Sequence, residues 1–97
     1  LVDGGSVLET HVELDGRVEN LGNSDSNKHA THVAGTLISS GVHLPISRGF
    51  AKNAHILTLD YQKLHFAEAV KELLSYGVLI SNHSYGFEGS DGLGEYD

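Results

Sequence analysis

Cysteine is absent from the 97 residues, and so are methionine and tryptophan. Without cysteine the chain can form no disulfide and no thiolate metal site. Basic residues are also few: six Lys and Arg stand against 13 Asp and Glu, which leaves a formal net charge of −7 with histidine neutral. Nucleic-acid binding needs Lys and Arg to displace counterions, and docking on anionic lipid needs a basic cluster. The charge balance therefore argues against a nucleic acid or a membrane surface as partner.

Long apolar runs are missing as well. No stretch approaches the roughly 18–20 apolar residues that cross a bilayer, and no segment has the pattern of a signal peptide. At this length the chain is one small domain or part of a larger one. It opens on Leu1-Val2-Asp3, which is typical of the end of a strand, so we expect it to be cut from a longer protein.

Apolar periodicity divides the chain into alternating strands and helices. The segment 66–76 has apolar residues at three- and four-residue spacing, which is typical of a helix with one apolar face. Short apolar runs rich in β-branched residues indicate strands instead. On these patterns we expect strands at 1–2, 55–61 and 78–80, helices at 30–40 and 66–76, loops at 3–28 and 41–52, and a surface loop in the acidic tail 88–97.

The order strand, helix, strand, helix, strand predicts an α/β fold with a parallel sheet and flanking helices. Ser26 or Asn27 can cap the start of the first helix, and Gly77 stands where the second should end. Three strands and two helices are few for an independent doubly wound fold. We therefore expect a partial sheet whose remaining strands lie outside these residues.

The run HATHVAGT, residues 29–36, places two histidines at the start of the first expected helix. Imidazole is the side chain best suited to exchanging a proton near neutral pH. Asp3 follows the first strand, and catalytic groups collect at the carboxyl ends of strands in open α/β sheets. A carboxylate there can accept a hydrogen bond from Nδ1–H of His29 and leave Nε2 free as a base. His32, one turn later, is interpreted as a packed, hydrogen-bonded residue.

Other interpretations of these residues stay open at this point. Asp3 followed by two glycines is also typical of a turn in which the aspartate bonds its own backbone. His29 is also compatible with a helix-capping or surface histidine. A metal site at His29 and His32 is disfavoured, because metal-binding pairs on helices more often use i, i+4 spacing with an acid between them.

Four segments, in order, resemble the subtilisin-like (S8) serine peptidase family. HATHVAGT is similar to the family's histidine motif HGTHVAGT, with Ala30 in place of glycine. Residues 3–5, Asp-Gly-Gly, resemble its aspartate motif Asp-Ser/Thr-Gly. Residues 49–54 resemble the segment Gly-Val/Met-Ala-Pro-x-Ala, and residues 82–86 resemble the strand end Asn-x-Ser-x-Gly. The resemblance covers residues 1 to about 86 and identifies 1–97 as the N-terminal portion of a doubly wound peptidase domain.

The resemblance implies a serine endopeptidase that hydrolyses peptide bonds through an Asp-His-Ser triad. His29 would be its general base and acid and Asp3 the residue that orients it, while Ser84, Tyr85 and Gly86 would bind a peptide or protein substrate. The family's nucleophile motif, Gly-Thr-Ser-x-Ala, does not occur in the chain, so the chain alone is expected to be inactive. The alternative is a non-catalytic subtilase-like module that keeps the peptide-binding cleft.

The resemblance also implies a secreted or cell-surface location, no cofactor, and the remainder of the same catalytic domain as a partner. Family members often hold Ca²⁺ in oxygen-rich loops. The loop after Asp3 contains four acids that could ligate Ca²⁺: Glu13, Asp15, Glu19 and Asp25. Their spacing lacks the order of a calcium-binding loop, so a solvated acidic loop is expected.

Overall fold

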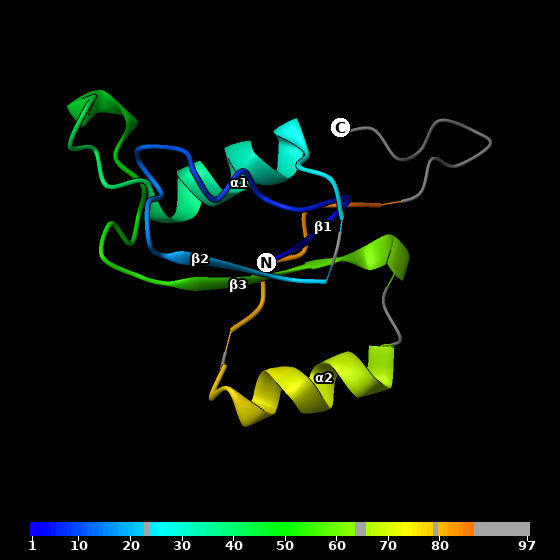
Figure 1. Cartoon of the computed structure of the whole chain (residues 1–97). Helices are drawn as coiled ribbons and strands as arrows, with labels where there is room; N and C mark the ends of the chain where they lie inside the picture. The colour runs from blue at the N-terminus through cyan, green and yellow to red at the C-terminus, as the bar shows by residue number, and fades with distance from the viewer. Residues whose placement is uncertain (23, 64–65, 79, 87–97) are drawn as a thin grey trace, which may run out of the picture.

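The computed structural model describes residues 1–22, 24–63, 66–78 and 80–86. Its elements are strand β1 (Val2–Asp3), strand β2 (Val18–Leu21), helix α1 (Lys28–Ile38), strand β3 (Ile56–Asp60) and helix α2 (Phe66–Ser75), with 3-10 turns at Pro45–Ser47 and Tyr61–Lys63. Figure 1 shows α1 on one side of the sheet and α2 on the other. The α/β fold class, a small parallel sheet with flanking helices, is confirmed. The acidic tail 88–97 lies outside the described residues.

The three strands form one parallel sheet in the order β1-β3-β2. Beyond β1, a single parallel bridge joins Val2 to His83, and the N–H of Val2 donates to the carbonyl of Asn82 at 2.9 Å. Asp3 and Asp60 are register partners, so the carboxyl ends of β1 and β3 lie side by side, at the edge of the sheet formed by the strand ends. That edge is where the candidate catalytic groups lie.

The expectation of an uninterrupted loop over 3–28 is wrong at β2. The sequence of β2, Val-Glu-Asn-Leu, has polar residues at its centre and therefore contains no apolar run. Its stability comes from pairing with β3 and from Asn20. The Oδ1 of Asn20 accepts the N–H of Val7 at 2.9 Å and the hydroxyl of Thr58, and its Nδ2 donates to the carbonyl of Val7 at 2.9 Å. Contacts with residues far away in the sequence thus stabilise a strand that local propensity does not indicate.

The strand expected at 78–80 is absent at the positions that the structure describes. Val78 and Ile80 belong to no strand, Ile80 is 88% exposed, and Leu79 lies outside the described residues. The physical reason is that β1, the neighbour with which this segment would pair, spans only Val2–Asp3. Among the described residues, this part of the chain meets the sheet at the bridge between Val2 and His83.

Helix α2 ends where the sequence predicts. Gly77 has φ +79°, and its N–H donates to the carbonyl of Leu74 at 3.0 Å. Of the expected apolar stripe, Ala69 is buried, but Leu74 is 63% exposed, so the stripe is not covered along its whole length. Among the described residues, no helix is long and apolar enough to cross a membrane.

Helix α1 packs on the sheet through small residues. Ala30, Ala34 and Ile38, spaced by four, are buried and join Val7 and Leu14 in the core. Of the two expected caps it is Asn27 that acts, because its Oδ1 accepts the N–H of Ala30 at 2.9 Å. The alanine side chains let the helix backbone approach the strands, which brings the first turn of α1 to the sheet edge.

Buried Glu13 ties the loop after α1 to the loop before β2. Its carboxylate accepts the hydroxyl of Ser40 at 2.8 Å and the N–H groups of Val42, His43 and Leu44 at 3.0, 2.7 and 3.1 Å. The residue is only 5% exposed. Burial alone raises the pKa of Glu13, but the hydrogen bonds from Ser40, His43 and Leu44 outweigh burial and lower the pKa from 4.5 to about 2.

We expect Glu13 to make the fold sensitive to acid. Because its pKa is lowered in the folded state, its stabilisation is fully present above about pH 4.5 and is lost as the pH falls through about 2. Urea unfolding of wild type and Glu13→Gln at several pH values measures this. The difference in unfolding free energy should shrink from neutral pH toward pH 2. Glu72→Gln, on the exposed surface of α2, is the control and should show no such trend; a constant difference for Glu13→Gln would contradict the role of this carboxylate.

Candidate active site

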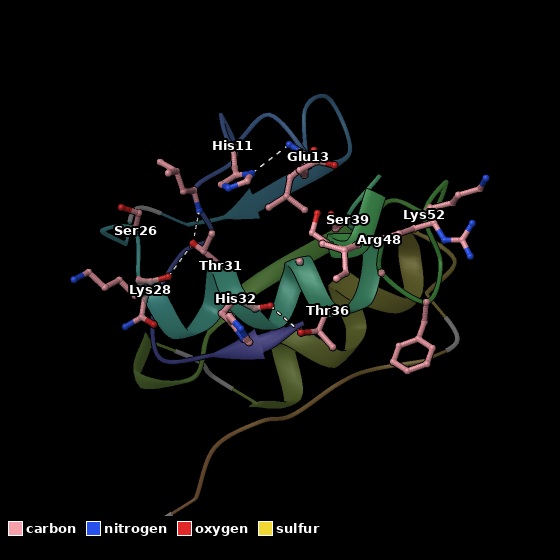
Figure 2. Close-up of a pocket in the computed structure, with 18 residues that line it drawn as sticks. His11, Glu13, Ser26, Lys28, Thr31, His32, Thr36, Ser39, Arg48 and Lys52 are labelled. Carbon is pink, nitrogen blue, oxygen red and sulfur yellow. Dashed lines mark hydrogen bonds between the residues drawn. The ribbon is translucent and has the colours of Figure 1, made fainter. Parts of the chain in front are cut away.

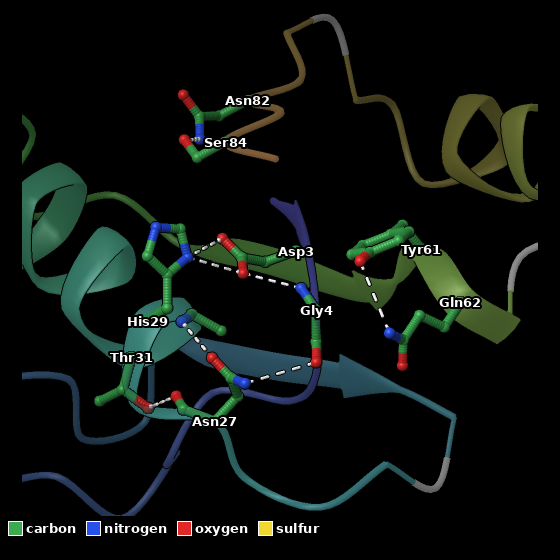
Figure 3. A network of polar contacts seen from close by, with 10 residues as sticks. Asp3, Gly4, Asn27, His29, Thr31, Tyr61, Gln62, Asn82 and Ser84 are labelled. Atoms are coloured by element: carbon green, nitrogen blue, oxygen red, sulfur yellow. Dashed lines mark hydrogen bonds and ion pairs between the residues drawn. The ribbon is translucent and has the colours of Figure 1, made fainter. Parts of the chain in front are cut away.

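The structure brings Asp3 and His29 together, although they are 26 positions apart in the sequence. Nδ1 of His29 lies 2.9 Å from Oδ1 and 3.0 Å from Oδ2 of Asp3 (Figure 3). Because a carboxylate only accepts hydrogen bonds, Nδ1 carries the proton, and Nε2 of the neutral ring has none. The side chain of Asp3 is 4% exposed and that of His29 is 59% exposed. The pair therefore combines a buried carboxylate with an accessible imidazole.

Asp3 is also held by its own turn. The N–H of Gly4 donates to Oδ1 of Asp3 at 2.7 Å. Asp3 therefore bonds its own backbone, as the alternative interpretation expected, but at the next residue, and this bond coexists with the contact to His29. The turn fixes the direction of the carboxylate, and the helix fixes the position of the imidazole.

The turn after β1 approaches the start of α1 closely because position 5 is glycine. A Cβ on Gly5 would lie 2.7 Å from Cβ of Asn27 and 3.1 Å from the carbonyl oxygen of Asp25. Asn27 donates from Nδ2 to the carbonyl of Gly4 at 3.4 Å, while its Oδ1 caps α1. One asparagine thus connects the aspartate turn to the helix that carries His29. At position 4, a Cβ would make an ordinary contact, 3.4 Å from Tyr61.

Ala30 and His32, the neighbours of His29 in the motif, have different surroundings. Ala30 is fully buried, and its methyl group is part of the core on the covered face of α1. His32 is exposed, and within the described part of the chain its ring makes no hydrogen bond. The interpretation of His32 as a packed, hydrogen-bonded residue is therefore wrong. The reason is that the sheet covers the face of α1 that bears the alanines and leaves the face of His32 open.

Residues 84–86, the expected substrate contacts, follow the point where the chain meets β1. The bridge between Val2 and His83 sets this segment parallel to β1. The hydroxyl of Ser84 accepts a hydrogen bond from Nδ2 of Asn82 at 2.8 Å. Figure 3 shows Asn82 and Ser84 beyond the imidazole of His29, on the side of the dyad away from Asn27.

An aromatic stack holds Tyr85, and sequence reasoning did not find its partner. The ring of Tyr85 stacks on Tyr61 with centroids 4.5 Å apart and planes 12° apart. Nδ1 of His83 lies 3.0 Å from the hydroxyl oxygen of Tyr85. Tyr61 directly follows β3, so the stack attaches residues 84–86 to the sheet edge that carries the dyad. No local pattern links residues so far apart in the chain.

The acids that were weighed as calcium ligands do not gather. The carboxylate of Glu13 is engaged by residues 40–44 instead. Across the described ranges, no group of three or more His, Cys, Asp or Glu side chains is arranged to hold a metal ion. The arrangement of this region, an accessible imidazole against a buried carboxylate, is suited to proton transfer by His29.

Comparison with known proteins agrees with the motifs. The family model of the subtilases, Peptidase S8, matches residues 7–96. The match includes His29 and residues 84–86 and begins after Asp3, so the assignment of Asp3 depends on its contact with His29. No curated protein and no solved structure shows a significant match to the chain.

Proposed function

Because the chain belongs to the subtilase family, whose members have a serine peptidase type of function, we propose that it forms part of a serine endopeptidase with an Asp-His-Ser triad. Asp3 and His29 are two members of that triad, and the serine nucleophile lies outside the 97 residues. The observation that carries the proposal is the contact of Nδ1 of His29 with both oxygens of Asp3, at 2.9 and 3.0 Å.

In this proposal His29 moves the proton. Its Nε2 takes the proton of the serine hydroxyl as that oxygen attacks the peptide carbonyl carbon, and it returns the proton to the leaving amine as the C–N bond breaks. Asp3 accepts the hydrogen bond from Nδ1–H throughout and keeps the ring in the required tautomer. Its negative charge also offsets the dipole at the start of α1, which disfavours an imidazolium there.

Residues 84–86 are proposed to bind the substrate backbone. An extended peptide would add as a further strand beside them and align its scissile bond with the dyad. The parallel course of this segment next to β1 supports the proposal, as does the stack that fixes Tyr85 against Tyr61. Tyr85 would then shape a subsite upstream of the scissile bond.

A fluorophosphonate probe tests the role of His29 in the protein that contains this stretch of chain. Such a probe reacts with a serine that an adjacent base activates. We expect wild type to be labelled and His29→Ala to be labelled at least about a thousandfold more slowly. The matched control is His32→Ala, on the same helix and exposed, which should be labelled at nearly the wild-type rate.

Labelling of His29→Ala at the wild-type rate would remove His29 from the mechanism. A wild-type protein that binds peptides but takes no label would favour the alternative, a non-catalytic subtilase-like binding module. The sequence after Asp97 separates the same two possibilities, because a Gly-Thr-Ser-x-Ala segment there supports the peptidase.

A further inference from the structure

Tyr61 contacts both the turn that holds Asp3 and the segment proposed to hold a substrate. It directly follows β3. Its ring atom Cε1 would lie 3.4 Å from a Cβ on Gly4, so the ring edge lies against the residue that follows Asp3. The face of the same ring stacks on Tyr85, with centroids 4.5 Å apart. Figure 3 shows Tyr61 on the side of Asp3 and Gly4 away from His29.

Other contacts hold the rest of Tyr85 and its neighbours. Nδ1 of His83 lies 3.0 Å from the hydroxyl oxygen of Tyr85, and Nε2 of the same imidazole lies 2.9 Å from Oγ of Ser81. The bridge between Val2 and His83 fixes the backbone of this segment beside β1. The backbone, the hydroxyl and the ring face thus each have a separate support, and Tyr61 supplies the support of the ring face.

The position of residues 84–86 matters because a peptide that adds as a strand is aligned by the segment it pairs with. A misplacement of about 1 Å in an active site can cost about a hundredfold in rate. A binding segment that is already ordered also spares the substrate the entropy cost of ordering it. A residue that holds this segment against the turn of Asp3 therefore affects substrate binding without contacting the substrate.

We propose that Tyr61 is a positioning residue for substrate binding, because its stack on Tyr85 fixes residues 84–86 beside the turn of Asp3. The inference rests on the proposed function, in which Tyr85 shapes a subsite upstream of the scissile bond. Tyr61 acts through Tyr85 and takes no part in proton transfer. The stack should therefore matter for peptides that extend upstream into that subsite and not for substrates too short to reach it.

Hydrolysis of two substrates by the protein that contains this stretch of chain tests the role of Tyr61. One is a peptide with four residues upstream of the scissile bond, and the other has a single upstream residue. Tyr61→Ala should raise KM for the long peptide by about five- to tenfold, the size of one lost aromatic pair, and leave kcat near the wild-type value. KM for the short substrate and the rate of fluorophosphonate labelling should not change, because neither uses the upstream subsite.

Two further variants separate the loss of the stack from a loss of folding. Tyr61→Phe keeps the ring and should restore the wild-type KM, because the hydroxyl of Tyr61 accepts only a long, exposed hydrogen bond from Nε2 of Gln62, at 3.5 Å, within the described residues. Tyr61→Leu keeps apolar bulk without a flat ring and should raise KM for the long peptide as well. Circular dichroism confirms that each variant is folded.

Phe50→Ala is the matched control for the removal of an aromatic ring. Phe50 lines the groove along the face of α1 that the core residues leave open (Figure 2), and neither Tyr61 nor Tyr85 is among the described residues of that lining. This variant should leave KM for both substrates unchanged.

An unchanged KM for the long peptide in Tyr61→Ala would overturn the inference, and so would equal rises for the two substrates or a similar rise in Phe50→Ala. A wild-type protein that takes no fluorophosphonate label would instead refute the proposed peptidase function. In that case the dissociation constant of the long peptide, measured by fluorescence anisotropy, takes the place of KM. Absence of binding by wild type, or a dissociation constant that Tyr61→Ala leaves unchanged, would then overturn the inference on its own.

Discussion

Asp3→Asn is expected to lower kcat for peptide hydrolysis by about four orders of magnitude in the peptidase that contains this dyad, with little change in KM. The hydrogen bond from the N–H of Gly4 to Oδ1 of Asp3, at 2.7 Å, gives the physical reason. An asparagine would keep its carbonyl oxygen at that donor and turn its NH₂ toward Nδ1 of His29. That NH₂, at the position of Oδ2 and 3.0 Å from Nδ1, favours the tautomer in which Nδ1 accepts and Nε2 carries the proton, and this Nε2 cannot take a proton from the serine.

Asp60→Asn is the matched control for this prediction. Asp60 ends β3 as the register partner of Asp3, and its carboxylate accepts the hydroxyl of Ser24 at 2.8 Å and the N–H of Gln62 at 2.9 Å. It makes no contact with His29 within the described residues, so kcat should stay near the wild-type value. Steady-state kinetics of the two folded variants measure kcat and KM for this comparison. A wild-type kcat for Asp3→Asn, or an equal loss for Asp60→Asn, would refute the orienting role of Asp3.

Gly49→Ala is expected to destabilise the fold by about 3 kcal/mol or more. A Cβ at this position would lie 2.7 Å from the carbonyl oxygen of Gly35, 2.7 Å from the nitrogen of Ser39 and 2.8 Å from the nitrogen of Ile38. All three atoms belong to the backbone at the end of α1, so no side chain can rotate away to make room. The loop at residues 46–52 would have to move off the helix, which breaks the hydrogen bonds of Gly49, Phe50 and Ala51 to the end of α1.

Gly35→Ala is the comparison variant, and we expect it to raise the free energy of unfolding where Gly49→Ala lowers it. Gly35 lies within α1, and a Cβ there would have no described atom from outside the helix backbone within 4 Å. Alanine should therefore stabilise the helix by about 0.5–1 kcal/mol, because it restricts the unfolded backbone more than glycine does. Urea unfolding of both variants measures the two effects. An unchanged free energy of unfolding for Gly49→Ala would show that the loop can separate from α1 at little cost.

The parts of the fold that the sequence predicted have local signals. Helix α1 is one such part, because the cap Asn27 and the small apolar residues at 30, 34 and 38 are close in sequence. Strand β3 is another, because it is a short apolar run. The dyad was predicted from motifs at Asp3 and His29, and the structure joins them because the turn after β1 lies against the start of α1, where Asn27 bonds both.

The parts that sequence reasoning missed depend on contacts between distant segments. Strand β2 forms because β3 and the side chain of Thr58 are beside it, although Asn20 disfavours a strand locally. The expected packing of His32 failed for a related reason. The spacing of residues in a helix shows which side chains share a face, but it does not show which face another element will cover. The stack of Tyr61 on Tyr85 likewise has no counterpart in any local pattern.

Through Asn27, the folding of the chain fixes the spacing of Asp3 and His29. The amide of Asn27 donates to the carbonyl of Gly4 after β1 and accepts from Ala30 in α1, so the two elements that carry Asp3 and His29 share one side chain. In solution, aligning a carboxylate with an imidazole costs translational and rotational entropy. Here that entropy is lost once, when the chain folds, and it is not lost again at each encounter with a substrate.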